Sequence, residues 1–308
     1  MAASKAPGAG RPMVKPGQLS GWFTTPAILI GLLFTLGPIV VITVFSFMSQ
    51  PESGSGVVMR FSTKGYEHFL FQEDFYGNLL FDPRYLNAFG LSAWQAIATT
   101  GISILLAFPI SIWMATKNAK TQNILLLLVT IPFWTNLLVR TYAWILFFSG
   151  DGTINSVLGW FGIEPQQLLY NPQSTLVALI YTFLPFAVLP MYSALSGFDF
   201  RLAEAAYDLG AKKWDVVRRI LWPAVSGGVL SAIALCFVPA FGSYIQPVLL
   251  GGGKVLMVGN LIADQYGSAR NWPFGAALSV IILAITLLGA WALLAWAKRS
   301  SQKVSLAV

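Results

Sequence analysis

Six separate apolar stretches, each long enough to cross a lipid bilayer, constrain the fold of this chain more than any other feature. Crossing a hydrocarbon core takes about 20 helical residues, and the stretches lie at 22–48, 86–115, 123–148, 175–195, 224–250 and 272–296. Prolines interrupt several of them, which lipid-embedded helices tolerate where neighbouring helices or water satisfy the freed carbonyl groups. We therefore predict an all-α integral membrane protein with six kinked transmembrane helices around an internal path.

The composition excludes the two main alternatives to a membrane protein. Hydrophobic residues make up 56% of the 308 residues and charged residues only 10%, against roughly 25% charged in a typical soluble domain. A soluble chain of this size could not bury so much apolar surface, and a disordered chain needs low hydrophobicity and high charge. The single cysteine, Cys236, and the single histidine, His68, also exclude an intrachain disulfide and a His/Cys metal cluster.

Basic residues are concentrated in alternate connecting segments. With the N-terminus inside, the inner segments carry 13 of the 19 Lys and Arg residues and the outer loops carry 5, whereas 8 of the 12 acids lie outside. This bias places both termini in the cytoplasm by the positive-inside rule. It also explains the net charge of +7 without a nucleic-acid partner. We expect Lys117, Arg218 and Lys303 on the cytoplasmic side, and Lys64, Glu164 and Lys254 outside.

The chain divides into one membrane domain and two tails. Residues 1–21 are rich in Gly, Pro and Ala and carry Lys5, Arg11 and Lys15, which predicts a disordered basic cytoplasmic tail rather than a cleavable signal peptide. Residues 22–298 form the six-span domain, which includes a cytoplasmic loop at 197–222. Residues 299–308 are predicted to be a short cytoplasmic tail.

The loop at 197–222 has the pattern of a helix, a turn and a second helix. Residues 201–209 are mostly good helix formers, and Gly210 follows where a glycine cap would reverse the chain. Apolar residues spaced as on one helical face follow at Trp214, Val217 and Leu221. Pro223 then begins the next span, where its missing N–H costs nothing. A surface hairpin that merely joins two spans would also satisfy this pattern.

A second pattern in the loop favours docking of another protein. Ala203, Ala206 and Gly210 would form a face with almost no side chains, against which a foreign backbone could pack closely. Glu204-Ala205-Ala206, then Gly210, Ile220 and Trp222-Pro223 at their spacings resemble the EAA loop of ABC-importer permeases. Trp222 departs from the leucine of that pattern. The resemblance covers nearly the whole chain except the N-terminal tail.

The resemblance implies a type I ABC importer permease in the bacterial inner membrane, with multiple spans. It implies that the loop is the coupling helix, which docks into a cytoplasmic dimer of ATPase subunits whose closure drives the permease outward-facing. The ATPase-coupling residues would be Glu204, Ala205, Ala206, Gly210, Trp214, Ile220 and Pro223. The expected partners are a second permease subunit, with a paralogue favoured over a copy, a periplasmic substrate-binding protein and membrane lipid.

The chain has no G-x-x-x-x-G-K-[ST] phosphate loop. The nearest phrase is the Gly251-Gly252-Gly253-Lys254 run, which lacks the spacing and lies in a predicted outer loop. No cofactor is therefore predicted in this chain. The resemblance places ATP and Mg²⁺ on the partner ATPase subunits.

Two further segments, 131–144 and 271–277, resemble spermidine/putrescine permeases, which implies polyamine import. Pro132, Asn136, Arg140 and Trp144 recur every four residues, so a continuous helix would carry them on one kinked, polar face. An arginine within a span faces the bundle interior or a water-filled cavity by default. The candidate pathway residues are Trp134, Asn136, Arg140, Tyr142, Trp144, Tyr181, Tyr244, Gln246 and Trp272.

The substrate is not fixed by these residues. Polyamine ammonium groups need carboxylates and aromatic faces, but the segment 242–247 has no acid and Asn271 stands where the resemblance leads one to expect aspartate. The outer acids are candidates or merely solvated, Asp264 among them, and a partner permease could supply others. The alternatives are another small nitrogenous solute, such as an amino-acid derivative, and a membrane-embedded enzyme, which would need paired carboxylates or a nucleophile inside the spans.

Overall fold

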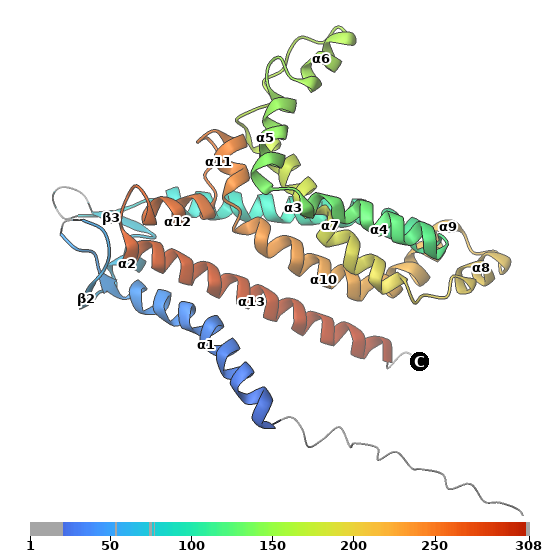
Figure 1. Ribbon diagram of the computed structural model, residues 1–308, viewed down its shortest axis with the longest axis horizontal. Coiled ribbons are helices and arrows are strands. Elements are labelled where there is room, and N and C mark those ends of the chain that lie inside the picture. Colours follow the sequence, from blue (N-terminus) through green and yellow to red (C-terminus); the bar gives the residue numbers. More distant parts are fainter. Residues whose placement is uncertain (1–20, 53, 74–75, 77, 306–308) are drawn as a thin grey trace, which may run out of the picture.

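The computed structural model describes residues 21–52, 54–73, 76 and 78–305, which form a bundle of long helices (Figure 1). The longer helices are α1 (Gly21–Ser46), α3 (Arg84–Ala115), α4 (Ala119–Trp134), α5 (Leu137–Phe148), α7 (Pro172–Leu195), α10 (Trp222–Phe241) and α13 (Trp272–Ser305). The shorter ones are α2 (Lys64–Glu67), α6 (Thr153–Trp160), α8 (Arg201–Asp208), α9 (Lys213–Val216), α11 (Ile245–Gly251) and α12 (Val258–Tyr266). Of the tail predicted at 1–21, residues 1–20 lie outside the described residues, and Gly21 is the first residue of α1. The last helix runs beyond the predicted domain end at 298, to Ser305.

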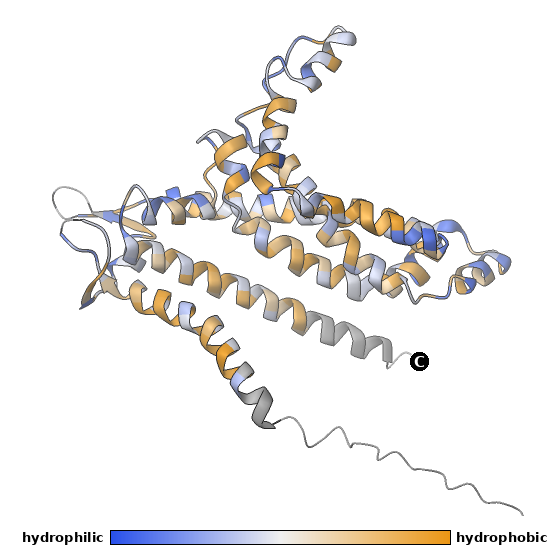
Figure 2. Cartoon of the chain, in the orientation of Figure 1, coloured by the Kyte–Doolittle hydropathy of each residue, from blue (hydrophilic) through white to orange (hydrophobic). Residues whose placement is uncertain are grey.

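The described chain has five helical segments that are long and apolar enough to cross a membrane, and a bent pair that makes six when counted as one span. Figure 2 shows apolar residues along the middle of the bundle and hydrophilic residues gathered towards its ends. Apolar side chains stay exposed where no helix covers them, for example Leu33 (69%) and Phe34 (76%) on α1. Such a surface is stable in lipid rather than in water. The predicted six-span, all-α fold is confirmed.

Helices α3, α7 and α10 form the core of the bundle, and each packs along the other two. The buried face of α3 is built from small and weakly polar side chains, which let helix backbones approach closely in lipid. Its buried members include Ser92, Gln95, Ala96, Thr99, Ser103, Ala107 and Ser111. Ser111 Oγ donates to the Val188 carbonyl of α7 at 3.2 Å. On a separate flank, α1 packs along α13.

Helix α10 crosses α7 at Gly228. A Cβ on Gly228 would lie 2.6 Å from the Pro190 carbonyl oxygen and 2.8 Å from Met191 Cα, so the backbones are already in contact. A Cβ on the neighbouring Gly227 would meet no described atom within 4 Å. Because the segment 197–221 connects α7 to α10, this crossing holds together the two helices that carry the loop.

The third predicted span, 123–148, is wrong as a single helix. Thr135 and Asn136 are extended, with ψ of 143° and 136°, and the helical segments on either side meet at 91°. Pro132, inside α4, has no N–H to donate to the helix, which ends two residues later at Trp134. Asn136 accepts a hydrogen bond from Leu138 N at 2.8 Å, which caps α5. The prediction of one polar face, with a member at every fourth residue, requires an unbroken helix. The break at Thr135 and Asn136 therefore makes that prediction wrong.

The fifth predicted span, 224–250, also ends early. Helix α10 stops at Phe241 and Gly242 caps it, with φ −88° and ψ 11°. The chain then turns into the separate short helix α11, in which Pro247 lies in the first turn, where its missing N–H has no partner to lose. The polar residues of 242–246 therefore line a helix break instead of a continuous helix.

Two short antiparallel ribbons, which the sequence did not predict, lie at one end of the bundle. Strand β1 (Met48–Ser49) pairs with β2 (Val58–Phe61), and β3 (Phe71–Glu73) pairs with β4 (Leu79–Phe81). Just after β4, the Asp82 carboxylate accepts hydrogen bonds from Arg84 Nε at 2.7 and 3.0 Å, and Arg84 Nη2 donates to Gln72 Oε1 at 2.8 Å. The hydrogen bond from Arg84 lowers the pKa of Asp82.

The connecting segments sort to two ends of the molecule. Figure 1 shows the α8–α9 segment, the α3–α4 turn and the C-terminal end of α13 at one end, and the ribbons, α2 and α12 at the other. Helices α5 and α6 project sideways from the bundle. The segments richest in basic residues thus share one end, as the positive-inside pattern requires.

Candidate functional site

The segment between α7 and α10 forms a compact hairpin, here called the α8–α9 hairpin (201–221). Its turn follows the end of α8, where Gly210 has a φ of +81°, a left-handed conformation that glycine adopts without strain. Gly210 N donates to the Tyr207 carbonyl and Ala211 N to the Ala206 carbonyl, both at 2.9 Å. This pair of bonds is the Schellman motif that ends many helices. The predicted glycine turn is confirmed.

The inner face of the hairpin packs on the bundle. Ala203, Val216 and Leu221 are buried, and Phe108 and Ile112 of α3 pack against them. The predicted stripe is wrong at its first residue, because Trp214 is 71% exposed. Likewise, Ala203 is 8% exposed and faces inward rather than outward.

The register differs from the prediction because a π-helical turn, η1 (Val217–Leu221), follows α9. Pro223 has no N–H, and in η1 the Trp222 N–H bonds to the Val217 carbonyl, five residues back. The extra residue puts Val216 and Leu221, five apart, on the same side. It also joins α9 and α10 into one helical segment from Lys213 to Phe241, whereas the sequence predicted a separate short helix.

The outer face of the hairpin is exposed and partly apolar. Leu202 (57%), Tyr207 (46%), Leu209 (89%) and Trp214 (71%) are open to solvent, and Glu204 and Ala205 are exposed beside them. A hollow of about 410 Å³ lies between the turn and the second helix, lined by Gly210, Asp215, Arg219 and Ile220 among others. Grouped apolar exposure on a polar end of a protein marks an interaction surface.

Three of the predicted pathway residues share a cavity of about 370 Å³ at the α10–α11 break, here called the inner cavity. They are Arg140 from α5, Tyr244 and Gln246. Ser243 Oγ donates to Gln246 Oε1 at 2.6 Å, and Gln246 Nε2 donates to Thr182 Oγ1 at 3.4 Å. The Nε and Nη1 atoms of Arg140 are buried and have no hydrogen-bond partner among the described residues. A guanidinium so placed requires an acceptor.

The other predicted pathway residues lie elsewhere. The Trp144 ring centroid is 5.6 Å from that of Tyr181, and the Trp272 centroid is 6.2 Å from that of Tyr266. Trp134 and Tyr142 are 78% and 56% exposed and line neither cavity described here. Asn136 is the N-cap of α5. The structure therefore does not bring the nine residues into one site.

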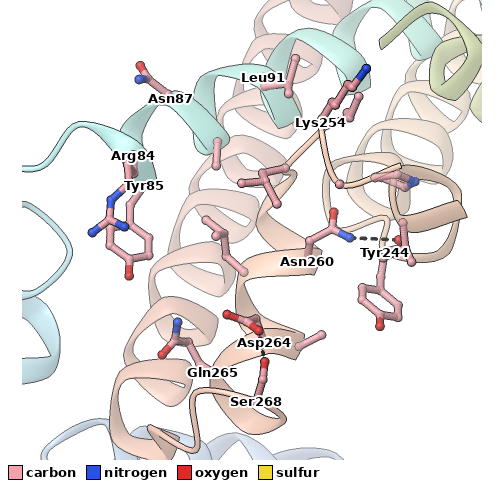
Figure 3. Close-up of a pocket in the computed structure, with 18 of the residues that line it drawn as sticks. Arg84, Tyr85, Asn87, Leu91, Tyr244, Lys254, Asn260, Asp264, Gln265 and Ser268 are labelled. Carbon is pink, nitrogen blue, oxygen red and sulfur yellow. Dashed lines mark hydrogen bonds between the residues drawn. The ribbon is translucent and has the colours of Figure 1, made fainter. Parts of the chain in front are cut away.

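A larger cavity of about 840 Å³, here called the outer cavity, was not predicted (Figure 3). It lies between the first turns of α3, the segment before α12, and α12 itself. Its polar lining residues include Arg84, Tyr85, Asn87, Tyr244, Lys254, Asn260, Asp264 and Gln265. Asn260 Nδ2 donates to the Tyr244 carbonyl at 3.3 Å, which ties α12 to the α10–α11 break. Arg84 and Gln265 are 181 positions apart in the sequence, so only the fold reveals the cavity.

Residues 107–305 match the family described as the inner membrane component of binding-protein-dependent transport systems. The chain belongs to this family. It is a permease subunit of an ABC importer and a multi-pass inner membrane protein, not an enzyme. Permeases of this family work with ATPase subunits and a periplasmic binding protein.

Relatives cover most of the chain. The spermidine/putrescine transport system permease protein PotB of Escherichia coli K12 is 34% identical over 265 residues, which is 84% of this chain and 92% of the relative. PotB of Haemophilus influenzae is 37% identical over 207 residues, or 65% of this chain and 71% of the relative. A chain of a bacterial alginate ABC transporter, solved with an alginate pentasaccharide-bound periplasmic protein, aligns with a TM-score of 0.63 and 15% identity, covering 92% of this chain and 93% of that one. This last likeness supports the type I importer fold alone.

Proposed function

We propose that this permease imports polyamines, with spermidine or putrescine as substrate. The observation that carries the proposal is the 34% identity to PotB over 84% of this chain. The exposed Tyr244 ring at the boundary of both cavities supports it, because aromatic faces attract organic ammonium groups.

The α8–α9 hairpin is the coupling element of this proposal. Its outer face, with Glu204, Ala205 and Trp214 exposed, docks into the cytoplasmic ATPase. Its inner face packs on α3, and its second helix continues into α10, so displacement of the hairpin is transmitted to two core helices. Alternation between inward- and outward-facing states follows from this connection. ATP and Mg²⁺ act on the ATPase subunits.

The orientation follows from the same assignment. The hairpin end of the molecule faces the cytoplasm, as do both termini and the tails at 1–21 and 299–308, and the end with the ribbons and α12 faces the periplasm. One hairpin engages one ATPase subunit, so the transporter contains two permease chains. The family resemblance favours a paralogue as the second chain.

A second candidate function is the import of an amino-acid derivative. The observation that favours it is the guanidinium of Arg140 in the inner cavity, whose Nε and Nη1 have no hydrogen-bond partner in the part of the chain that the structure describes. A carboxylate on the solute would satisfy that group with a charge-assisted hydrogen bond, whereas a polyamine would not.

The test is uptake into proteoliposomes that contain the permease, its partner permease and its ATPase, with the binding protein outside and ATP inside. We expect radiolabelled spermidine or putrescine to accumulate in an ATP-dependent manner. A tenfold excess of an amino-acid derivative should leave this uptake unchanged. Uptake of the amino-acid derivative without uptake of either polyamine would favour the second candidate and contradict the first.

A further inference from the structure

The outer cavity contains three charged residues, and they are not equivalent. The guanidinium of Arg84 already has acceptors outside the cavity, because it donates to both Asp82 carboxylate oxygens and to Gln72 Oε1. Asp264 is the one acid among the residues lining the inner and outer cavities. Lys254 lies at the opposite end of the outer cavity from Asp264 and Ser268 in Figure 3. The cavity is therefore polarised, negative at α12 and positive at the segment before it.

The Asp264 carboxylate retains free acceptor capacity. Ser268 Oγ donates to Asp264 Oδ1, and Oδ2 receives no hydrogen bond within the described part of the chain. Asp264 is exposed to the cavity and forms no ion pair with a described residue. A carboxylate accepts several hydrogen bonds, so this group can take a further N–H donor.

The surroundings of Asp264 suit an alkyl ammonium group. Tyr85 and Gln265 line the same part of the cavity and lie to one side of Asp264 in Figure 3. Leu91 and Leu261 provide apolar wall for methylene groups. Carboxylate, aromatic ring and apolar wall together match a chain of methylenes that ends in an ammonium.

We propose that Asp264 binds a terminal ammonium of the polyamine in the outer cavity and that Lys254 orients the chain by repelling the cation from the opposite wall. This assignment rests on the proposed polyamine function. In this assignment, Asp264 is the first group of the permease to contact a cation released at the periplasmic end. The cavity, at about 840 Å³, falls in the size range of small-molecule sites.

The proposal is tested by binding of tritiated spermidine to the purified permease–ATPase complex without the binding protein. Asp264→Asn removes one charge-assisted hydrogen bond and should raise Kd at least fivefold. Lys254→Gln should lower Kd, because it removes the repulsion. Glu164→Gln, an exposed acid that lines neither cavity, is the matched control and should leave Kd unchanged.

The outcomes separate this proposal from the proposed function. If wild-type proteoliposomes import no polyamine, the proposed function fails. If they import spermidine but Asp264→Asn binds it with unchanged Kd, or the wild-type complex shows no binding, the Asp264 assignment is overturned. Should Asp264→Asn fail to reach the membrane, Lys254→Gln decides: a lower Kd supports the proposal, and an equal or higher Kd overturns it.

Discussion

Replacing Gly228 with alanine should disrupt the crossing of α7 and α10. The new Cβ would lie 2.6 Å from the Pro190 carbonyl oxygen and 2.8 Å from Met191 Cα, both backbone atoms that cannot rotate away. Overpacking of this kind costs about 1–3 kcal/mol. The matched change Gly227→Ala meets no described atom within 4 Å and should stabilise the helix by about 0.5–1 kcal/mol. Two adjacent, chemically identical substitutions should thus differ by at least about 1.5 kcal/mol.

Thermal unfolding of the purified complex in detergent, followed by tryptophan fluorescence, measures this difference. A change of 1 kcal/mol moves Tm by about 2–4 °C in a domain of 150–250 residues and by less in a larger chain, so we expect Gly228→Ala to unfold at least about 2 °C below Gly227→Ala. Gly228→Ala should also reduce ATP-dependent uptake, since the two helices joined by the α8–α9 hairpin would separate. An equal or higher Tm for Gly228→Ala would refute the close approach described here.

Two further predictions concern Arg140 and the topology. The guanidinium of Arg140, whose Nε and Nη1 have no partner among the described residues, requires an acceptor on the second permease chain or on the solute, so Arg140→Met should reduce transport by leaving that acceptor unpaired. Arg140→Lys should restore only part of the uptake, because an ammonium cannot form the planar two-point contact. Near wild-type uptake by Arg140→Met at matched expression would contradict a role in the pathway. In a Cys236→Ala background, an impermeant thiol reagent applied from the periplasm should label the Glu164→Cys variant but not the Arg218→Cys variant. Labelling of Arg218→Cys from outside would contradict the proposed orientation.

The sequence predicted the number of spans well because apolar length alone determines which segments lipid can solvate. It also predicted the glycine turn of the hairpin, since Gly210 follows a short run of helix formers. Both features depend on local sequence. Tertiary contacts depend on which helices pack together, and the predictions about such contacts failed.

The failures have specific physical causes. Asn136 was interpreted as one polar residue on a helix face, whereas it caps a new helix after Pro132. The sequence does indicate a helix start here, because asparagine is a preferred N-cap. The long apolar stretch on both sides instead favoured the interpretation as one continuous span. The sequence predicts that Pro223 begins a span, whereas the helical segment starts upstream at Lys213, and the π-helical turn Val217–Leu221 just before Pro223 changes the register so that Trp214 is exposed. The outer cavity could not be predicted, since Tyr85 and Asp264 line the same cavity only because α3 packs against α12.

The central claim is that the α8–α9 hairpin couples this permease to its ATPase, and Gly210→Asp tests it most directly. The hairpin turn places Gly210 at a φ of +81° with no described atom within 4 Å of a Cβ. Aspartate tolerates this left-handed region better than most residues, so the variant should fold and insert while its side chain and charge obstruct docking. Gly197→Asp is the matched control, because Gly197 is also exposed in the α7–α8 connection, without a positive φ.

The measurement is ATP-dependent spermidine uptake into proteoliposomes, together with the amount of ATPase retained on the purified permease. We predict normal membrane levels for both variants, at least a tenfold loss of uptake and reduced ATPase retention for Gly210→Asp, and near wild-type values for Gly197→Asp. Full uptake with normal ATPase retention by Gly210→Asp would contradict the docking role of the hairpin.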